Sequence, residues 1–450
     1  MTFLYYAVGV LVIAVGIGAS IALHEIGHLV PAKKFGVKVT QYMVGFGPTL
    51  WSRKRGDTEY GVKAIPLGGY IRMIGMVPPR ADGKVSRWPR RMATAVEDFR
   101  QVSRAEVRPG DEEREFYRLT PGKKMIVMLG GPCMNLVIYL VLTVVLLVGL
   151  GLPKDEPTTT VATVTKCVSP ANATKAELSK CTQTNSPAAI AGLQPGDKIL
   201  SVNGTAVSSW DQLVAMVEPS ADKQLAVVVE RDGTPITLQI TPVRNLKYAN
   251  DTGTKTKTAG FVGISPTDHH FYENVALTAV PGQIGNQIGK GLSALGRYPE
   301  KIGSLWDTVF HGTPRDPNGA IGVVGIGRIG GEYAETNLLD TKDKVFALIS
   351  LLASVNLLLF FFNLLPLLPL DGGHVAGAIV EATRRGWARL RVRKKAPVLD
   401  TDGGEAAIRK PIYVDTAQML PVMYAVASVL IVLTLLTLYA DIVKPVNLGS

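Results

Sequence analysis

The stretch that decides the fold is residues 345–374, VFALISLLASVNLLLFFFNLLPLLPLDGGH. Its first 26 residues carry no ionisable side chain. A helix needs roughly 20 apolar residues to cross the hydrocarbon core of a bilayer, about 30 Å thick. Asp371 is the first charged residue after this run. We therefore predict a transmembrane helix that ends close to a carboxylate.

Three further runs have the same uncharged, apolar character. They are residues 1–23, 125–153 and 416–440. Charged residues begin near the ends of every run, which argues against four buried helices of a large soluble protein. The first run has no basic segment before it, so we expect a retained helix rather than a cleaved signal peptide. The chain is thus predicted to be a polytopic α-helical membrane protein with four transmembrane helices.

The distribution of charge predicts the orientation of these helices. The chain has a net charge of +11, although only 19% of its residues are charged. Residues 31–124 contain 20 basic and 10 acidic side chains, residues 371–415 contain 9 and 6, and residues 154–343 contain 17 and 19. Basic residues favour the cytoplasmic side, so we expect 31–124 and 371–415 there and both termini and 154–343 outside. The positive balance thus indicates orientation, and no nucleic-acid partner is expected.

Ionisable residues end the first apolar run. The sequence there is His24-Glu25-Ile26-Gly27-His28. Residues four apart share one face of a helix, so both imidazoles can reach one metal ion. The glutamate between them can act as a general base on a water molecule bound to that metal. Ionisable residues at membrane depth are costly and usually functional. An interfacial cluster of polar residues at a helix end is the simpler alternative.

A catalytic zinc ion needs a third protein ligand and one open position. Asp371 ends the third apolar run, and the predicted topology brings the ends of the first and third runs to the same side of the membrane. His24, His28 and Asp371 are therefore expected at a similar depth, as one metal site.

The segment around Asp371 is predicted to leave the helical conformation. Pro366 and Pro369 interrupt the helix, and Gly372-Gly373 are expected to permit an unusual backbone. Such a segment is tolerated at membrane depth where it lines protein or a water-filled cavity, and a metal site is one such place. His374 is either a further ligand or, as we expect, a neighbour with a structural role.

These two motifs together resemble those of the site-2 protease family, the intramembrane zinc metalloproteases. The family carries H-E-x-x-H in its first core helix and Asn-x-x-Pro-x-x-x-Leu-Asp-Gly in a later one. The positions that match the second motif are Asn363, Pro366, Leu370, Asp371 and Gly372. Many bacterial members have their second proline one residue earlier than Pro369.

The resemblance implies a zinc metalloendopeptidase with one Zn²⁺ per chain. By this resemblance His24, His28 and Asp371 bind the metal. Glu25 then activates the attacking water, and Asn363 helps to hold the substrate backbone.

Two glycine-rich segments after the first helix are similar to the family's membrane-associated β elements. They are residues 45–48, GFGP, and residues 64–72, AIPLGGYIR. In the family such elements are thought to present an edge strand to the substrate, and a plain glycine-rich hairpin is the alternative. The substrate-binding residues that the resemblance implies are Gly45, Phe46, Gly47, Gly68 and Gly69. Residues 131–135 also fit the family's second core helix.

The exterior region contains a string, AGLQPGDKILSVNG at residues 191–204, that resembles PDZ domains of bacterial envelope proteases. The resemblance covers residues 158–245 and implies an inserted α+β domain. We expect a short helix at residues 213–217 and a hairpin that joins residues 225–231 to residues 236–240 through Asp-Gly. Such domains bind a peptide at a sheet edge, so this one either recognises peptide or a substrate ectodomain, or limits access to the membrane site.

Three cysteines are present. Cys167 and Cys181 lie in the exterior region, where an oxidising environment favours a disulfide between them, with two free thiols as the alternative. Cys133 lies within the second apolar run and is expected to be a packed small side chain.

The predicted organisation has eight parts. They are a first transmembrane helix with HExxH (1–30), a cytoplasmic loop with membrane-associated β-hairpins (31–124), a second transmembrane helix (125–153), the PDZ domain (158–245), an extracytoplasmic connector with an amphipathic helix (246–343), a third transmembrane helix (344–374), a cytoplasmic loop (375–415) and a fourth transmembrane helix (416–440). Within the two loops, residues 79–118 are either a partner contact or a solvated segment. Residues 384–410 are expected near anionic lipid heads.

The function that this combination predicts is regulated intramembrane proteolysis in the bacterial inner membrane. The arrangement is similar to that of the branch that cleaves anti-sigma factors, so the expected substrates are single-span membrane proteins whose outer domain has been trimmed. A non-proteolytic PDZ scaffold with a vestigial metal site is the alternative. A metal transporter would need ionisable residues in several spans, and here they lie only at the ends of the first and third runs.

Overall fold

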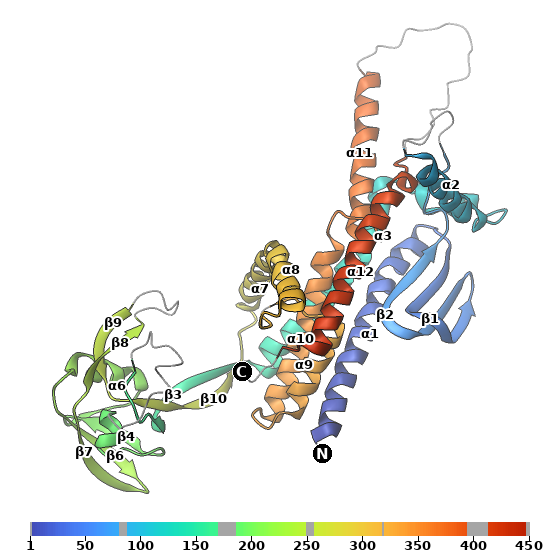
Figure 1. The fold of residues 1–450 in the computed structure, drawn as a ribbon. Coiled ribbons are helices and arrows are strands. Elements are labelled where there is room, and N and C mark those ends of the chain that lie inside the picture. The colour runs from blue at the N-terminus through green and yellow to red at the C-terminus, as the bar shows by residue number, and fades with distance from the viewer. Residues whose placement is uncertain are drawn as a thin grey trace, which may run out of the picture. The chain divides into compact units, whose positions relative to one another are not determined.

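The computed structural model describes residues 2–80, 88–169, 186–248, 256–316, 319–393 and 413–446. The chain divides into two compact units. The first comprises Met1–Gly151 and Asn274–Ser450 and is mainly helical; the second comprises Leu152–Glu273 and is built mainly of strands (Figure 1).

Four helices of the first unit are long and apolar enough to cross a membrane. They are α1 (Thr2–Lys34), α3 (Pro121–Val144, extended by a π-helical turn to Leu150), α10 (Thr341–Asn363) and α12 (Leu420–Val443, preceded by a 3-10 turn, Thr416–Met419). Large apolar side chains such as Leu11 and Val432 are more than half exposed on these helices, as expected of a surface that faces lipid. The prediction of four membrane-spanning helices is confirmed.

Glycines set the distance between α1 and α3. A Cβ atom added to Gly27 would lie 2.2 Å from the carbonyl oxygen of Gly130, and one added to Gly130 would lie 2.0 Å from that of Gly27. The two backbones are therefore in direct contact, an arrangement that small residues allow between membrane helices. This crossing lies one residue before His28, so it brings the end of α1 against α3.

Three shorter α-helices lie between Asn274 and α10 in the described residues: α7 (Val280–Gly296), α8 (Tyr298–Trp306) and α9 (Val323–Glu335). The amphipathic helix predicted within residues 246–343 corresponds to helices α7 and α8. The glycine-rich stretch at 321–327 opens α9, and no strand precedes it in residues 312–316 and 319–322.

α9 is held against α1 and α12. A Cβ atom at Gly9 of α1 would lie 2.3 Å from the carbonyl oxygen of Gly330. The carboxylate of Asp441 in α12 accepts hydrogen bonds from the N–H groups of Gly322 and Gly325, both at 2.9 Å. A side chain from a distant helix therefore caps the first turn of α9.

A curled antiparallel sheet lies beside α1. It is formed by β1 (Val39–Arg55) and β2 (Thr58–Met73). The first half of β1 lies between the two halves of β2, because Val44 is paired with both Val62 and Gly69. Residues 69–73 therefore form one edge of the sheet, with β1 as their only strand partner among the described residues.

Two helices lie outside the four spans on the side that carries the charged connections. α2 (Arg90–Ala105) follows the sheet, and α11 (Asp371–Arg393) follows α10. α11 differs from the expected loop at 375–415, since it continues the chain as a helix to Arg393; residues 394–412 lie outside the described residues. Residues 79–118 contain α2 and two 3-10 turns, Glu112–Arg114 and Phe116–Arg118.

The second unit is an antiparallel sheet with the strand order β10-β3-β4-β6-β7 and a separate hairpin, β8-β9. Its elements are β3 (Leu152–Val164), α5 (Pro187–Ile190), β4 (Lys198–Val202), β5 (Thr205–Ala206), α6 (Trp210–Val217), β6 (Leu225–Arg231), β7 (Thr234–Ile240), β8 (Val243–Tyr248), β9 (Thr256–Phe261) and β10 (Ile264–Glu273). The predicted short helix is confirmed as part of α6, and the predicted hairpin as β6-β7. Asp232 and Gly233 connect the hairpin with positive φ angles of 50° and 78°, as a two-residue turn requires.

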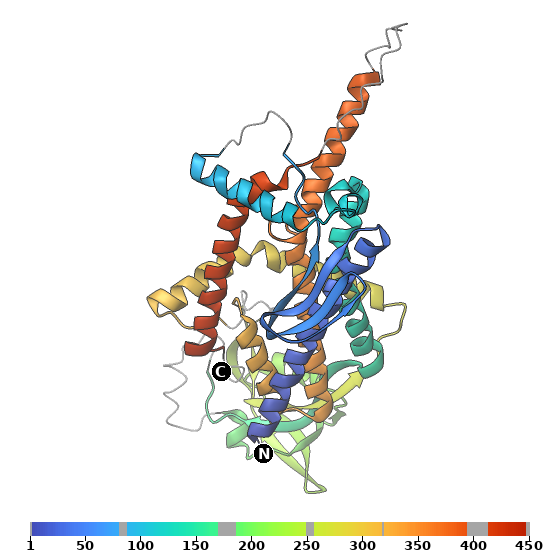
Figure 2. The same cartoon turned by 90° about the vertical axis from the view of Figure 1, so that its right-hand side faces the viewer.

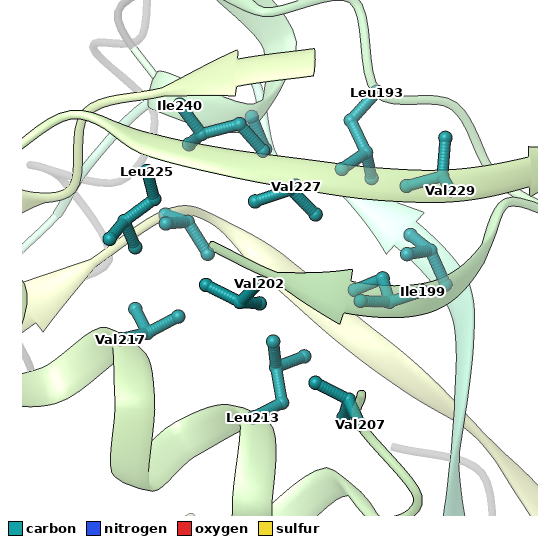
Figure 3. Close-up of a cluster of buried hydrophobic side chains, with 13 residues drawn as sticks. Leu193, Ile199, Val202, Val207, Leu213, Val217, Leu225, Val227, Val229 and Ile240 are labelled. Atoms are coloured by element: carbon teal, nitrogen blue, oxygen red, sulfur yellow. The ribbon is translucent and has the colours of Figure 1, made fainter. Parts of the chain in front are cut away.

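One aliphatic cluster holds the second unit together. Leu225, Val227 and Val229 are alternate residues of β6 and point inward, where Leu213 and Val217 of α6 cover them (Figure 3). This period of two is the signature of a strand with one buried face. Burial of aliphatic side chains is the main stabilising term in such a core.

The two expectations about the cysteines have different outcomes. Cys133 is exposed on α3, so the prediction that it is packed inside the protein is wrong; it lies on a helix face that the first unit leaves uncovered. Cys181 lies outside the described residues, so its pairing with Cys167 stays a prediction.

Candidate metal centre

Three side chains from distant parts of the sequence converge at the end of α1. The Nε2 atoms of His24 and His28 are 3.2 Å apart, and each lies 3.4 Å from Oδ2 of Asp371. Among the described residues, these three form the one group of histidine, cysteine and acidic side chains whose donor atoms could share a metal ion. The structure thus brings together the three residues that the sequence selected as candidate ligands.

The hydrogen bonding of His28 leaves one ring nitrogen available. Its Nδ1–H donates to the carbonyl oxygen of Val127 on α3, at 2.8 Å. A histidine whose Nδ1 is protonated in this way presents the lone pair of Nε2. Nδ1 of His24 is buried and has no hydrogen-bond partner among the described residues.

The spacing of the donor atoms fits Zn²⁺. Zinc binds imidazole nitrogen and carboxylate oxygen at about 2.0–2.2 Å in tetrahedral sites, which places two ligands of one ion about 3.3–3.6 Å apart. The three separations around His24, His28 and Asp371 are 3.2, 3.4 and 3.4 Å. Two histidines and one carboxylate also form a donor set used by catalytic zinc, which leaves a fourth position open.

A glycine of α3 makes room for the two imidazoles. A Cβ atom at Gly131 would lie 2.2 Å from Nε2 of His28 and 2.7 Å from Nε2 of His24. Any side chain at this position would therefore occupy the space where the donor atoms meet. The sequence assigned residues 131–135 to the second core helix but did not indicate that Gly131 forms a wall of the site.

Asp371 is positioned by a break between two helices. α10 ends at Asn363, residues 364–370 are not helical, and α11 begins at Asp371. Gly372 and Gly373 have no positive φ, so the expectation of an unusual backbone there is wrong. Glycine is needed for proximity instead, because a Cβ atom at Gly372 would lie 2.3 Å from the carbonyl oxygen of Leu365.

Glu25 lies between α1 and the sheet. Its side chain is 8% exposed. A Cβ atom at Gly69 would lie 3.0 Å from Cγ of Glu25, so the edge segment of β2 passes directly beside this carboxylate. The sheet therefore adjoins the cluster at the residue that the sequence predicts to be the general base.

The remaining glycines predicted to bind substrate belong to the same sheet. Gly45, Gly47 and Gly68 have positive φ angles of 95°, 81° and 133°. Phe46 stacks on the ring of Tyr70 with 6.1 Å between the ring centres, and it is 45% exposed. They lie at a bend: before it β1 pairs with both halves of β2, and after it β1 pairs with the first half of β2 alone.

Two further residues that the sequence singled out, Asn363 and His374, lie on either side of Asp371 in the chain. Asn363 is the last residue of α10 and is half-buried. His374 lies in the first turn of α11 and is not one of the three residues whose donor atoms converge.

Two buried polar features lie near the site; the sequence placed the first of them in the second core helix without a role and did not indicate the second. Asn135 lies one turn beyond Gly131 on α3 and is 1% exposed, and neither atom of its amide has a hydrogen-bond partner among the described residues. Lys124 of α3 donates to Glu381 of α11 at 2.8 Å, and both are buried. This ion pair ties the helix that begins with Asp371 to the helix that carries Gly131. In the sequence, the only indication of this ion pair is a lysine that directly precedes an apolar run.

Membrane-spanning helices that carry such a donor set, with a buried glutamate beside it, define a class of protein: the membrane-embedded zinc metalloproteases. Comparison with known families supports this class. The model described as peptidase family M50 matches residues 12–398, and the chain belongs to this family.

Individual relatives agree with the family. The chain is 36% identical to zinc metalloprotease Rip1 of Mycobacterium tuberculosis over 453 residues, which cover 98% of this chain and 99% of the relative. It is 28% identical to metalloprotease MmpA of Caulobacter vibrioides, over 81% of this chain and 84% of the relative. It is 25% identical to zinc metalloprotease RasP of Bacillus licheniformis, over 82% and 88%. The predictions of the site-2 protease family, of a zinc metalloprotease and of Zn²⁺ as cofactor are confirmed.

Proposed function

We propose that this protein cleaves single-span membrane proteins within the bilayer, at the cluster of His24, His28 and Asp371. The observation that carries the proposal is the convergence of these three donor atoms at the end of a membrane-spanning helix, beside Glu25. Zn²⁺ bound there would polarise the scissile carbonyl and make the attacking water more acidic.

The residues of the chain would divide the remaining work. The hydrogen bond from His28 to Val127 holds the imidazole in the orientation that metal binding requires. Glu25 takes a proton from the attacking water and passes it to the leaving amine, as a general base and then a general acid. Its burial between α1 and β2 keeps other water from competing for this proton.

The free edge of the sheet is the proposed place for the substrate. Residues 69–73 pair with β1 on one side. An extended peptide could add to the other side as a further strand. A substrate helix must unwind to expose a peptide bond, and pairing with the edge would hold it in that extended form. Gly45, Phe46, Gly47, Gly68 and Gly69 would contact it there, and Asn363 would hold its backbone.

The second unit is proposed to be a PDZ domain outside the cytoplasm. The basis is the string at residues 191–204, together with the α6 helix and the β6-β7 hairpin. It would bind a peptide or a substrate ectodomain, or exclude substrates whose outer domain has not been trimmed. With this role, anti-sigma factors in the inner membrane of a bacterium are the proposed substrate class, with both termini of this chain outside the cytoplasm.

The decisive variant is Glu25→Gln, with Glu113→Gln, at an exposed position, as its matched control. The full-length proteins would be reconstituted in lipid nanodiscs with a single-span reporter, and its cleavage followed by gel electrophoresis. Loss of a general base lowers such rates by about 10²–10⁴-fold, so we expect cleavage only with the wild type and the control. If Glu25→Gln cleaves at the rate of the wild type, the proposed mechanism is wrong.

The substrate class needs a separate experiment. Membrane proteomes of cells that express wild-type protein or Glu25→Gln would be compared by mass spectrometry. We expect a trimmed single-span anti-sigma factor to accumulate only with the variant. Accumulation of other membrane proteins alone would reject this substrate class and leave the proteolytic mechanism intact.

A further inference from the structure

α2 is an amphipathic helix whose apolar side is only partly covered by protein. Val96 is buried, whereas Met92, Phe99 and Val102 are 46%, 37% and 58% exposed. At about 100° per residue these four lie within about 120° of the helix circumference. An apolar stripe therefore continues from the packed part of α2 onto its free surface.

α2 is fixed to the first residues of a membrane span. The guanidinium of Arg100 donates to both carboxylate oxygens of Asp415, at 3.0 and 3.1 Å, and to the carbonyl oxygen of Pro78. Trp88, just before the helix, donates its indole N–H to the carbonyl oxygen of Gln418. Figure 2 shows α2 lying across the end of α12.

This attachment determines the level of α2 relative to the bilayer. Val96 shares a buried cluster with Ala417 and Leu420, which open the span α12. Met419 and Val422 in the same part of the span are 47% and 44% exposed. Val96 thus fixes the apolar stripe of α2 at the start of a span that itself carries exposed apolar side chains.

More of the charged side chains of α2 are basic than acidic. The helix has four arginines and two acidic residues. A cavity of about 270 Å³ lies beside it, and its charged lining residues are Arg80, Arg90, Arg100 and Glu97. Arg100 is 3% exposed, and its Nε has no hydrogen-bond partner among the described residues, with Glu97 at 3.6 Å. Glu97 lies 3.6 Å from Arg100 and 3.9 Å from Arg80. The lining thus has three guanidinium groups and one carboxylate, and this excess of positive charge favours an anion.

We propose that α2 is a membrane-surface anchor that binds anionic phospholipid. Met92, Phe99 and Val102 enter the boundary between headgroups and acyl chains, and the arginine-lined cavity receives the lipid phosphate. Apolar stripes flanked by arginine bind such surfaces, and each basic residue near an anionic leaflet adds to the attraction. A second copy of the chain is a poorer occupant, because pairing two α2 helices would bring their excess arginines together.

The test is hydrogen exchange of full-length protein, followed by mass spectrometry. Nanodiscs of phosphatidylcholine would be compared with nanodiscs that also contain phosphatidylglycerol. We expect backbone amides of α2 to exchange about fivefold more slowly, or more, when the anionic lipid is present. The double variant Phe99→Gln, Val102→Gln should lose protection in both lipids, whereas Gln101→Ala, on the polar side, should behave as the wild type.

The cavity is tested by a second double variant, Arg80→Gln, Arg90→Gln. Here we expect the difference between the two lipids to disappear while protection in phosphatidylcholine remains. Equal exchange of wild-type α2 in both lipids and in detergent would overturn the proposal. Protection that rises with the number of protein copies per nanodisc would also overturn it, in favour of a second copy as the occupant. Thermal unfolding of each variant shows whether the rest of the chain is intact.

Discussion

The two units of the protein are held together by different means. In the first, backbones touch at glycines such as Gly27 and Gly130, and a few buried polar groups join the helices. In the second, alternating aliphatic side chains fill one core. Lipid is as apolar as leucine, so burial of aliphatic side chains gives little preference for one helix partner over another in a membrane, whereas in water it is the main driving force. Substitutions in the first unit should therefore act on close approach and polar pairing, and those in the second on the volume of the core.

The largest effect is expected at Gly131, where the helix crossing and the metal centre coincide. In Gly131→Val the new side chain would occupy the space at Nε2 of His28 and His24. We expect zinc content, measured by atomic absorption, to fall to the background level and cleavage to be lost. Gly122→Ala is the matched control, since a Cβ atom there meets nothing within 4 Å. Full zinc content in Gly131→Val would contradict the geometry described for the site.

Gly131 also illustrates how far the sequence predicts this protein. The four spans follow from runs without charge, and His24 and His28 follow from helical spacing. Asp371 follows from its expected depth in the membrane. The role of Gly131 depends on where α3 crosses α1, which no local pattern contains.

α9 was not predicted for a related reason. Its glycine-rich sequence has a low helix propensity, and the helix depends on partners far away in the chain. Gly9 admits it against α1, and Asp441, 116 residues from Gly325, caps its first turn. The sequence also could not predict that the first half of β1 has a strand partner on both sides. A hairpin pattern does not indicate which half of a strand is paired in this way.

The next effect concerns the buried ion pair between α3 and α11. Glu381→Ala would leave Lys124 as a buried charge without its carboxylate, and such losses typically cost about 3–5 kcal/mol. We expect a lower unfolding temperature in detergent, followed by circular dichroism. The double variant Lys124→Met, Glu381→Leu should recover part of the loss, because apolar residues of similar size can replace a buried pair. The contacts of Glu381 with Arg385 and with the N–H of Val414 stay broken in both variants. If the double variant is as unstable as the single one, packing and not charge is the cause.

The second unit should respond to lost volume in its core. Leu213 of α6 is 3% exposed within the aliphatic cluster. Leu213→Ala should destabilise this unit by roughly 2–5 kcal/mol through lost burial and a remaining cavity. In the full-length protein, hydrogen exchange of β4 and β6 should accelerate while zinc content stays unchanged. Loss of zinc in this variant would show that the metal centre of the first unit depends on the aliphatic core of the second.

The smallest effect is expected from an ion pair of the second unit that titrates in acid. Arg231 donates to both carboxylate oxygens of the buried Asp197, and this contact holds the pKa of Asp197 below its usual range. A carboxylate whose pKa is lower in the folded than in the unfolded state stabilises the fold above the unfolded pKa, about 3.9. That stabilisation is lost as the pH falls through the pKa that Asp197 has in the folded state. Below this pH the carboxyl group is protonated in both states. Acid unfolding of β4 and β6, followed by hydrogen exchange, should therefore begin at a higher pH in Arg231→Gln than in the wild type. The control is Arg244→Gln, which removes an exposed pair with Asp222 and should leave the pH of unfolding unchanged. Identical acid profiles for all three proteins would mean that the pair contributes nothing to the stability of this unit, and that its aliphatic core alone accounts for it.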